Sequence, residues 1–511
     1  MAKGAVAAGH SETAKAAEEV LHDGGNAFDA VVAAHLAACV AEPVLTSLGG
    51  GGFLLAKTAD DKETIYDFFA QTPSQRNPEP HFFPISADFG TVQQEFHIGA
   101  GSMAVPGTVK GVFAIHKDLG TLPMKRLVEP AVKLARIGLQ MNAFQSRVLD
   151  VVKPIYLKYP EAKNTFASPD IPGQLVQEGN LLKQPLMADL LEAIAVEGDD
   201  LFYNGDMAKK TASICKEEGG HLTEADFRNY RVIKRKPLVV GYRNCRLCIN
   251  PPPCSGGILV AFALKLLEEL PVQKQGFESV EYLNLLAEIQ GLTEKAKADA
   301  FVEGEDEANI LDPSYLEEYA SEVMGKFPAL RGTTHISIVD RDGNMASLST
   351  SNGEGCGIMI PGTGVMMNNM LGEEDINPKG FGKWPLNERM TSMMAPGILE
   401  MGNGRKIAFG SGGSNRIRTA ILQLLVNLAD FGMSPQEAVR SPRIHYERGL
   451  LNIEHGFDLN VVEALCKKFR NHRVWDRKDL FFGGTHVVSI DPGGYSGFGD
   501  PRRGGVSVIV N

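Results

Sequence analysis

The chain has 511 residues, of which 43% are hydrophobic and 22% charged, a balance typical of a globular protein with a large core. Its 62 acidic and 51 basic side chains give a net charge of -11 at pH 7, which argues against nucleic acid or an anionic membrane as a partner. Length alone predicts about three domains of ~150 residues, yet no Pro/Ser-rich or charge-rich linker and no internal repeat divides the chain.

The beginning of the chain shows no targeting segment. The first twenty residues carry several charges and no apolar core before a cleavage site, so no secretory signal is visible. We expect a cytoplasmic protein, or a periplasmic or secreted one if the sequence is that of a mature form. The most apolar stretch, residues 27–44, is interrupted by Asp29, His35 and Glu42 and is too short and polar to span a bilayer.

Seven scattered cysteines, an odd number in a long chain, do not predict a disulfide framework. Cys245 and Cys248 have the spacing of a metal or redox pair. They lie in a predicted strand, however, where positions three apart point to opposite faces, and no second ligand pair occurs elsewhere in the sequence. We therefore expect ordinary core residues here and no metal site.

Residues 332–351 are the most informative part of the sequence. Apolar residues alternate with Thr, His and Ser before a turn, and small hydroxyl residues recur at every second position after it, which predicts two half-buried strands joined in a hairpin. A three-residue loop with Gly343 in the left-handed conformation places Ser351 opposite Thr333. A two-residue loop would put Asn352 there.

The Gly332-Thr333 pair suggests a nucleophile inside its own precursor. A Thr hydroxyl is a weak nucleophile, but as the first residue of a chain it has its own α-amine as a base. That requires cleavage between Gly332 and Thr333, and a Gly before the Thr leaves the backbone free to adopt the geometry of attack. Thr is also a common strand residue, so this segment alone leaves both interpretations open.

A second glycine-rich segment, residues 410–414, precedes a predicted helix at residues 415–425. The amides of Gly412, Gly413 and Ser414 would then lie at a helix N-terminus, where an oxyanion is readily held, although an ordinary capped turn explains the pattern equally well. Neither this segment nor residues 49–52 has a nucleotide-binding spacing, so we expect no cofactor. No Gly-x-Ser-x-Gly elbow of a conventional serine hydrolase occurs.

Short motifs rich in glycine, proline and asparagine occur along the whole chain, at residues 24–30, 42–43, 49–53, 105–109, 203–205, 251–257, 333–335, 361–364, 368–369, 410–414 and 500–504. Each is weak alone, but their joint order and spacing are highly specific. On these motifs the chain resembles the γ-glutamyltranspeptidase family, in the N-terminal-nucleophile hydrolase class.

The resemblance implies a single αββα sandwich of the α+β class, two sheets between helical layers. It also implies a precursor that cleaves itself before Thr333, giving a large subunit (residues 1–332) and a small subunit (residues 333–511) that remain one intertwined domain as a heterodimer. The family has a second hydroxyl residue at the position of Ser351, which bonds the nucleophile. It places its oxyanion hole at the positions of Gly413 and Ser414, where Ser414 replaces a usual Gly.

The substrate-binding positions depart from the family pattern. Phe69 stands where the family has an Arg that grips the α-carboxylate of the glutamyl group, and losing that guanidinium removes a strong orienting contact. Met370 replaces a Gln and cannot hydrogen-bond comparably. Glu373 has the same charge as the family's Asp that contacts the α-amino group, and can replace it.

Other parts of that anchor are retained. Thr391 and Ser392 match a pair of family hydroxyls that hold the carboxylate, and Asn352 lies one position before the family's substrate-binding Asn. The leading prediction is therefore a hydrolase or transferase that cleaves γ-glutamyl amides through a threonyl acyl-enzyme, with water or an amine as acceptor. The alternative is an amidohydrolase whose acyl group lacks an amino-acid head, such as a glutaryl or oxamate-like amide. An unprocessed binding protein is a third interpretation.

Overall fold

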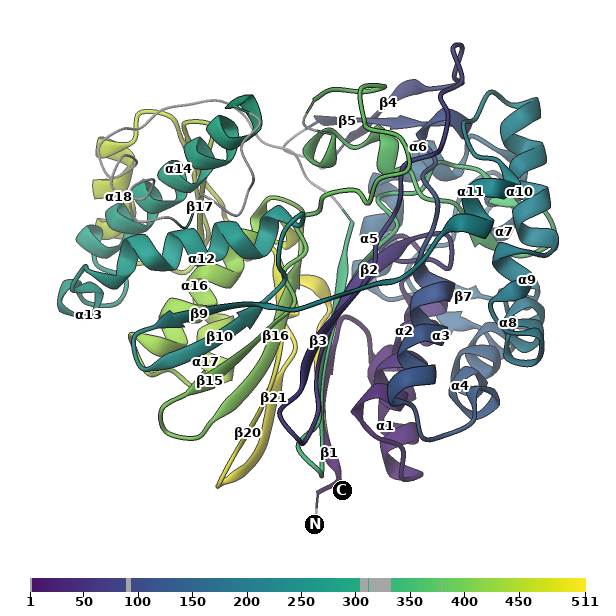
Figure 1. Ribbon diagram of the computed structural model, residues 1–511. Coiled ribbons are helices and arrows are strands. Elements are labelled where there is room, and N and C mark those ends of the chain that lie inside the picture. Colours follow the sequence, from purple (N-terminus) through teal and green to yellow (C-terminus); the bar gives the residue numbers. More distant parts are fainter. Residues whose placement is uncertain (1, 89–92, 304–310, 312–331, 378) are drawn as a thin grey trace.

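Two β-sheets packed face to face lie between two layers of helices (Figure 1). The computed structural model describes residues 2–88, 93–303, 311, 332–377 and 379–511. The layers form the αββα sandwich that the family resemblance implies, so the expected fold class is confirmed.

The first sheet takes its strands from both ends and the middle of the chain. Their spatial order is β22 (Val506–Val510), β1 (Gly4–Ala8), β11 (Thr334–Asp340), β12 (Met345–Ser351), β2 (Gly51–Lys57), β3 (Glu63–Phe68) and β8 (Ile233–Arg235). The second sheet contains β21 (Gly494–Phe498), β20 (Gly484–Asp491), β16 (Lys406–Gly412), β15 (Gly397–Met401), β10 (Cys245–Ile249) and β9 (Leu238–Tyr242). Since β1 pairs with both β22 and β11, segments before and after position 332 are neighbours in one sheet.

The helices divide between the two outer faces (Figure 1). Beside the first sheet lie α1 (Ser11–His22), α2 (Ala27–Ala41), α3 (Thr108–Leu119), α4 (Met124–Ile137), α5 (Ala143–Val151), α6 (Lys153–Tyr156), α7 (Pro160–Thr165), α8 (Pro185–Glu197), α9 (Asp200–Tyr203), α10 (Asp206–Glu217) and α11 (Glu224–Asn229). Beside the second sheet lie α12 (Ser255–Glu268), α13 (Val272–Gln275), α14 (Val280–Glu303), α16 (Arg416–Ala429), α17 (Pro435–Arg440) and α18 (Leu459–Lys468).

Short elements complete the described part of the chain. The small sheets pair β4 (Phe83–Asp88) with β5 (Gln93–Ile98), β6 (Leu139–Gln140) with β7 (Leu181–Leu182), β13 (Met359–Ile360) with β14 (Val365–Met366), and β17 (Ile444–Glu447) with β18 (Leu450–Ile453) and β19 (His472–Val474). The 3-10 turns are η1 (Ala100–Ser102), η3 (Met370–Gly372), η4 (Glu374–Ile376), η5 (Leu480–Phe482) and η6 (Pro501–Arg503).

Strand alternation separates two hydrophobic cores. Ala5 and Ala7 of β1 belong to the core that includes the second sheet and helices α12, α14 and α16. Val6 and Ala8, on the other face of the same strand, pack with α1 and α2. The period-2 alternation of a strand therefore lets each residue of the first sheet serve one core or the other.

The expectation of half-buried strands at residues 332–351 is wrong, because β11 and β12 are buried on both faces. Their alternating Ser residues do not face solvent but the second sheet, where they bond its backbone. Ser337 donates to the carbonyl of His486 in β20 (3.1 Å), and Ser347 donates to that of Phe409 in β16 (2.8 Å). Buried hydroxyls paired in this way avoid the cost of losing water, so a polar stripe is compatible with a core position.

The hairpin loop is the three-residue kind. The Asp340 amide donates to the Asn344 carbonyl (3.1 Å), and Gly343 has a φ of +87°, which favours glycine. The Asp340 carboxylate also accepts from the Ala27 amide at the start of α2 (2.8 Å). The loop thus fixes the register of the hairpin and its attachment to the helical layer.

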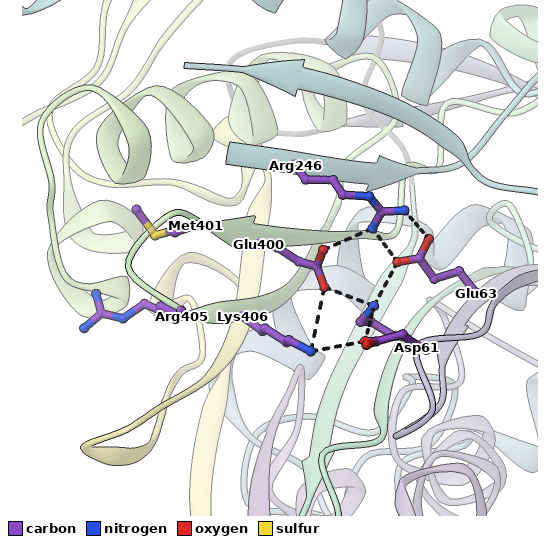
Figure 2. A pocket seen from close by; sticks show the side chains of 9 residues that line it. Asp61, Glu63, Arg246, Glu400, Met401, Arg405 and Lys406 are labelled. Carbon is purple, nitrogen blue, oxygen red and sulfur yellow. Dashed lines mark hydrogen bonds and ion pairs between the residues drawn. The ribbon is translucent and has the colours of Figure 1, made fainter. Parts of the chain in front are cut away.

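A cluster of charged side chains joins the two sheets at the ends of β2 and β3 (Figure 2). Lys57 of the first sheet binds Glu63 and Glu400 (both 3.0 Å), and Arg246 of the second sheet binds Glu63 (2.6 Å). Since Gly51 pairs with Ser351 and Lys57 pairs with Met345, this cluster lies at the far end of the strands from Ser351. We call it the charged clamp, because it ties one sheet to the other.

Two further findings concern the described residues only. No helix among them is long and apolar enough to cross a membrane. Their seven cysteines are free thiols, and no group of three or more His, Cys, Asp or Glu side chains within this part of the chain is placed to hold a metal ion.

Candidate active site

Thr333 lies directly before β11, in the middle of the first sheet, and is almost fully buried. Its Oγ1 donates to the carbonyl oxygen of Gly332 at 2.7 Å. The Oγ of Ser351 donates to the same oxygen, also at 2.7 Å. Two hydroxyl groups therefore converge on the carbonyl of the peptide bond that the sequence singles out for cleavage.

The hairpin register produces this convergence. Thr334 pairs with Thr350, so the next position outward places Thr333 opposite Ser351, as predicted. Ser351 Oγ also accepts from the amide of Gly353 (3.0 Å), which leaves its proton for the Gly332 oxygen. Hydrogen bonds to a carbonyl oxygen stabilise the negative charge that develops there when a nucleophile adds.

An acid holds the backbone on the N-terminal side of Gly332. The amide of Gly332 donates to Oε1 of Glu354 at 3.0 Å, and Glu354 is buried. Glu354 is not predictable from the sequence, because nothing near it in the sequence distinguishes it from a surface acid. The pairing of β11 with β12 places Glu354, which follows β12, next to Gly332.

The expected oxyanion site needs one correction. Gly412 is the last residue of β16 and pairs with Gly484, so it is not part of a helix N-terminus. It lies against the Thr333 carbonyl so closely that a Cβ there would collide with it. Gly413 and Ser414 form the turn, with φ of +121° and +52°, and α16 begins at Arg416. Within the described structure neither of their two amides donates a hydrogen bond.

The Ser414 side chain is held away from those amides. Its Oγ donates to the carboxylate of Asp375 in η4, and both residues are buried. This contact holds a left-handed backbone conformation that is unusual for a residue with a Cβ. Asp375 was visible in the sequence only as the end of an acidic run.

A small cavity adjoins the nucleophile. Its volume is about 30 Å³, which is about the space of one water molecule. It is lined by Phe69, Gly332, Thr333, Ser351, Met370, Glu373, Ile376, Ser392, Met393, Met394, Ser414 and Ile417. The structure thus brings together most of the predicted site residues, in a pocket whose walls are mainly apolar.

Two predicted substrate-binding residues are not part of this lining. Asn352 is fully buried, and its side-chain amide points to the carbonyl of Met366 (3.4 Å). Thr391 shares a hydrogen bond with Ser255 (3.0 Å) at the start of α12. Ser392 does line the cavity, but its Oγ accepts from the amide of Met394 (3.1 Å).

Glu373 fills the space that a side chain at position 353 would need. Gly353 has a φ of +63°, and a Cβ there would collide with Glu373 and Asn369. The Glu373 side chain is therefore sterically matched to a glycine at position 353.

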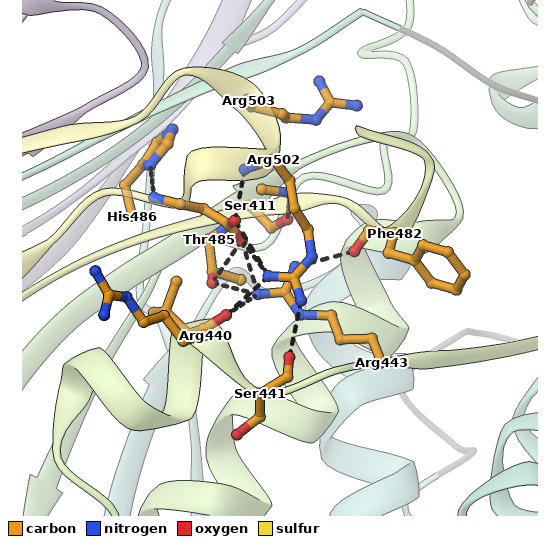
Figure 3. A network of polar contacts seen from close by, with 12 residues as sticks. Ser411, Arg440, Ser441, Arg443, Phe482, Thr485, His486, Arg502 and Arg503 are labelled. Carbon is orange, nitrogen blue, oxygen red and sulfur yellow. Dashed lines mark hydrogen bonds and ion pairs between the residues drawn. The ribbon is translucent and has the colours of Figure 1, made fainter. Parts of the chain in front are cut away.

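Arg503 contacts the backbone of Thr333. Its Nη1 donates to the Thr333 carbonyl (3.2 Å), and burial lowers the pKa of its guanidinium to about 10, so it stays charged at neutral pH. The turn that contains Arg503 is fixed by a buried network, in which Arg502 binds Glu454 (2.6 Å) and Arg443 binds Asp500 (2.8 Å). Figure 3 shows Arg443 and Arg502 side by side in this network.

His335, the histidine nearest to Thr333 in the sequence, hydrogen-bonds other residues. The two ring nitrogens of His335 bond Ser349 (2.8 Å) and Ser337 (2.9 Å) along the strand face. Burial lowers its pKa well below the usual value, so the ring is neutral at pH 7. His335 is therefore not placed to act as the base that activates the Thr333 hydroxyl.

The fold and the site together define an N-terminal-nucleophile hydrolase, with a Thr at the start of a central strand and an acceptor carbonyl immediately before it. The chain belongs to the gamma-glutamyltranspeptidase family, whose model matches residues 13–510. The protein is therefore an enzyme of this hydrolase and transferase family.

Curated relatives carry two kinds of name. The glutathione hydrolase proenzyme of Escherichia coli (strain K12) is 30% identical over 540 residues, covering 98% of this chain and 90% of that protein. The acylase ACY 1 proenzyme of Pseudomonas sp. (strain V22) is 32% identical over 517 residues, covering 96% and 90%. The crystal structure of cephalosporin acylase from Bacillus halodurans matches with a TM-score of 0.85 and 25% identity, covering 99% of this chain and 96% of that one.

Proposed function

We propose that this chain cleaves itself before Thr333 and then uses the new N-terminal Thr to cleave γ-glutamyl amide bonds. The observation that carries the proposal is the 2.7 Å contact between Thr333 Oγ1 and the Gly332 carbonyl, with Ser351 bonded to the same oxygen. Residues 1–332 and 333–511 then form the two subunits of one intertwined heterodimer.

The cleavage step is an acyl shift followed by hydrolysis. Thr333 Oγ adds to the Gly332 carbonyl carbon, the C–N bond breaks, and the departing nitrogen takes a proton to become the α-amine of Thr333. Water then hydrolyses the ester, giving a carboxylate on Gly332 and restoring the Thr333 hydroxyl. Ser351 stabilises the oxygen on which charge develops.

The same groups then serve substrate turnover. The α-amine of Thr333 accepts the hydroxyl proton while Oγ attacks the substrate carbonyl, and it returns that proton to the leaving amine. The amides of Gly413 and Ser414 stabilise the oxyanion, since neither donates a hydrogen bond in the described structure. Water or an amine acceptor then takes the acyl group from the threonyl ester.

Glu373 supports a γ-glutamyl substrate. Its carboxylate is buried at the cavity beside Gly353 and provides a negative charge for an α-ammonium group. Ser392 offers a hydroxyl on the same cavity. Membership of the family and the glutathione hydrolase names of several relatives agree with this choice.

A second candidate rests on the apolar walls of the cavity. Phe69 stacks on Phe53 with ring centroids 5.4 Å apart, and Met370 lies beside it, where the family has polar anchors. Such walls suit the methylene chain of an acyl group without an amino-acid head, such as a glutaryl amide. Relatives named acylase make this the alternative to test.

The test compares hydrolysis of γ-glutamyl-p-nitroanilide and glutaryl-p-nitroanilide by the purified wild type, with Thr333→Ala as the matched inactive variant. We expect the wild type to have the larger kcat/KM for the γ-glutamyl compound, and Thr333→Ala to lose both self-cleavage and turnover. Preference for the glutaryl compound would replace the leading proposal with the acylase. Normal cleavage and turnover by Thr333→Ala would exclude Thr333 as the nucleophile.

A further inference from the structure

Lys297, in the second half of α14, is a cation in the wall behind the candidate substrate cavity. Its Nζ lies 3.7 Å from the Sδ of Met393, and Met393 lines the cavity. Asp375, which binds the cavity residue Ser414, acts on the Lys297 ammonium electrostatically. One residue of the cavity wall, Met393, is therefore in contact with this ammonium group.

The Lys297 ammonium has a poor set of partners. Among the described residues it takes part in no ion pair within 4.0 Å, and its hydrogen-bond acceptor is a thioether, which is a weak one. The side chain is half-buried, and burial lowers the pKa of its ammonium. An ammonium so placed gains much more from a carboxylate than a solvated surface lysine does.

Other cations near the nucleophile already have partners. Arg503 binds the Thr333 carbonyl. Arg389 binds the Phe69 carbonyl and lies 3.6 Å from Asp67. Arg418 pairs with Glu447 (3.5 Å). Arg503, like Lys297, has no carboxylate within 4.0 Å among the described residues, but two carbonyl oxygens accept from its guanidinium, whereas Lys297 has only a thioether.

We propose that Lys297 binds the carboxylate of the acyl group and so selects substrates whose acyl chain ends in, or carries, a carboxylate. Met393 separates the ammonium from the cavity in the uncleaved chain. A methionine side chain is unbranched with three rotatable bonds, so it moves aside at low cost when an acyl chain enters. The inference rests on the proposed function and adds a specificity residue to it. Lys297 then supplies a positive charge to a pocket in which Phe69 stands where the resemblance places the family's carboxylate-binding Arg.

The test uses pairs of substrates that differ by this carboxylate. Glutaryl-p-nitroanilide is compared with pentanoyl-p-nitroanilide, and γ-glutamyl-p-nitroanilide with 4-aminobutyryl-p-nitroanilide, in processed wild type and Lys297→Met. We expect kcat/KM for the carboxylated member to fall about 10- to 100-fold, mainly through KM, because a charge-assisted hydrogen bond is lost. The uncharged member should change less than about twofold, and Lys297→Arg should retain most of the selectivity.

Lys468→Met is the matched control, since Lys468 pairs with Glu288 on the exposed side of α14 (3.0 Å) and should change neither substrate. A readout without turnover is thermal protection. Glutarate should raise the melting temperature of wild type and Lys297→Arg but not of Lys297→Met. Equal loss for both members of a pair, or equal protection of all three proteins, would overturn the role of Lys297. A wild type that stays uncleaved contradicts the proposed function instead, and the protection experiment still decides on Lys297.

Discussion

The Gly332 carbonyl oxygen accepts hydrogen bonds from Thr333 and Ser351, and these two contacts concentrate the chemistry of the site on one atom. Strand alternation and the turn at Gly343 predicted that Ser351 faces Thr333, and the family resemblance predicted a hydrogen bond from Ser351 to the nucleophile. In the structure the Ser351 hydroxyl donates to the Gly332 carbonyl instead. The sequence did not predict Glu354, Asp375 or Arg503, whose roles depend on contacts between segments far apart in the chain.

Replacing Ser351 tests the donor to the Gly332 oxygen. Ser351→Ala should slow self-cleavage by about 10²-fold or more, since removing one oxyanion donor typically costs that much in rate. The measurement is the fraction of cleaved chain over time on a denaturing gel. Ser347→Ala is the control, because it removes a buried hydroxyl from the same face of β12, whose one hydrogen bond among the described residues is to the Phe409 carbonyl. Equal cleavage rates in Ser351→Ala and wild type would show that this hydrogen bond does not assist the reaction.

At the scale of elements, the site depends on two sheets held in one relative position. Ser337 and Ser347 reach across from the first sheet to the second, and the charged clamp joins the two sheets at the end of the strands that is far from Ser351 (Figure 2). The sequence predicted the existence and register of β11 and β12 but not their complete burial. A Ser or Thr at alternate positions looks solvent-facing until a second sheet supplies carbonyl partners.

The charged clamp gives a pH-dependent stability. The Arg246 guanidinium lowers the pKa of Glu63 to about 2, below the value of about 4.3 expected in an unfolded chain. Its stabilisation is therefore complete above about pH 4.3 and is lost as the pH falls through 2. Glu63→Gln should lower the free energy of unfolding at pH 7 by about 1–2 kcal/mol, after allowance for solvent screening of this partly exposed cluster.

Thermal unfolding from pH 7 down to pH 2 checks this expectation. The difference between wild type and Glu63→Gln should be largest at neutral pH and shrink between about pH 5 and pH 2, whereas Glu288→Gln, at an exposed pair, should differ little throughout. A gap that stays constant down to pH 2 would mean that the Glu63 charge does not stabilise the clamp.

For the whole molecule, the central feature is that one sheet is built from both sides of Gly332. Strand β11 pairs with β1 on one side and β12 on the other, and β12 pairs with β2. A cut before Thr333 therefore leaves these ladders and both cores intact, so the two pieces should stay together. Composition did not predict this arrangement. The family motifs did, because their order along the chain implies the sandwich.

The most direct measurement is intact mass spectrometry of the freshly purified wild type, under denaturing and native conditions. We predict two denatured species corresponding to residues 1–332 and 333–511, and one native species with their combined mass. A single full-length species that persists after long incubation would contradict the account, since Thr333 would then never acquire the α-amine that the catalytic cycle requires.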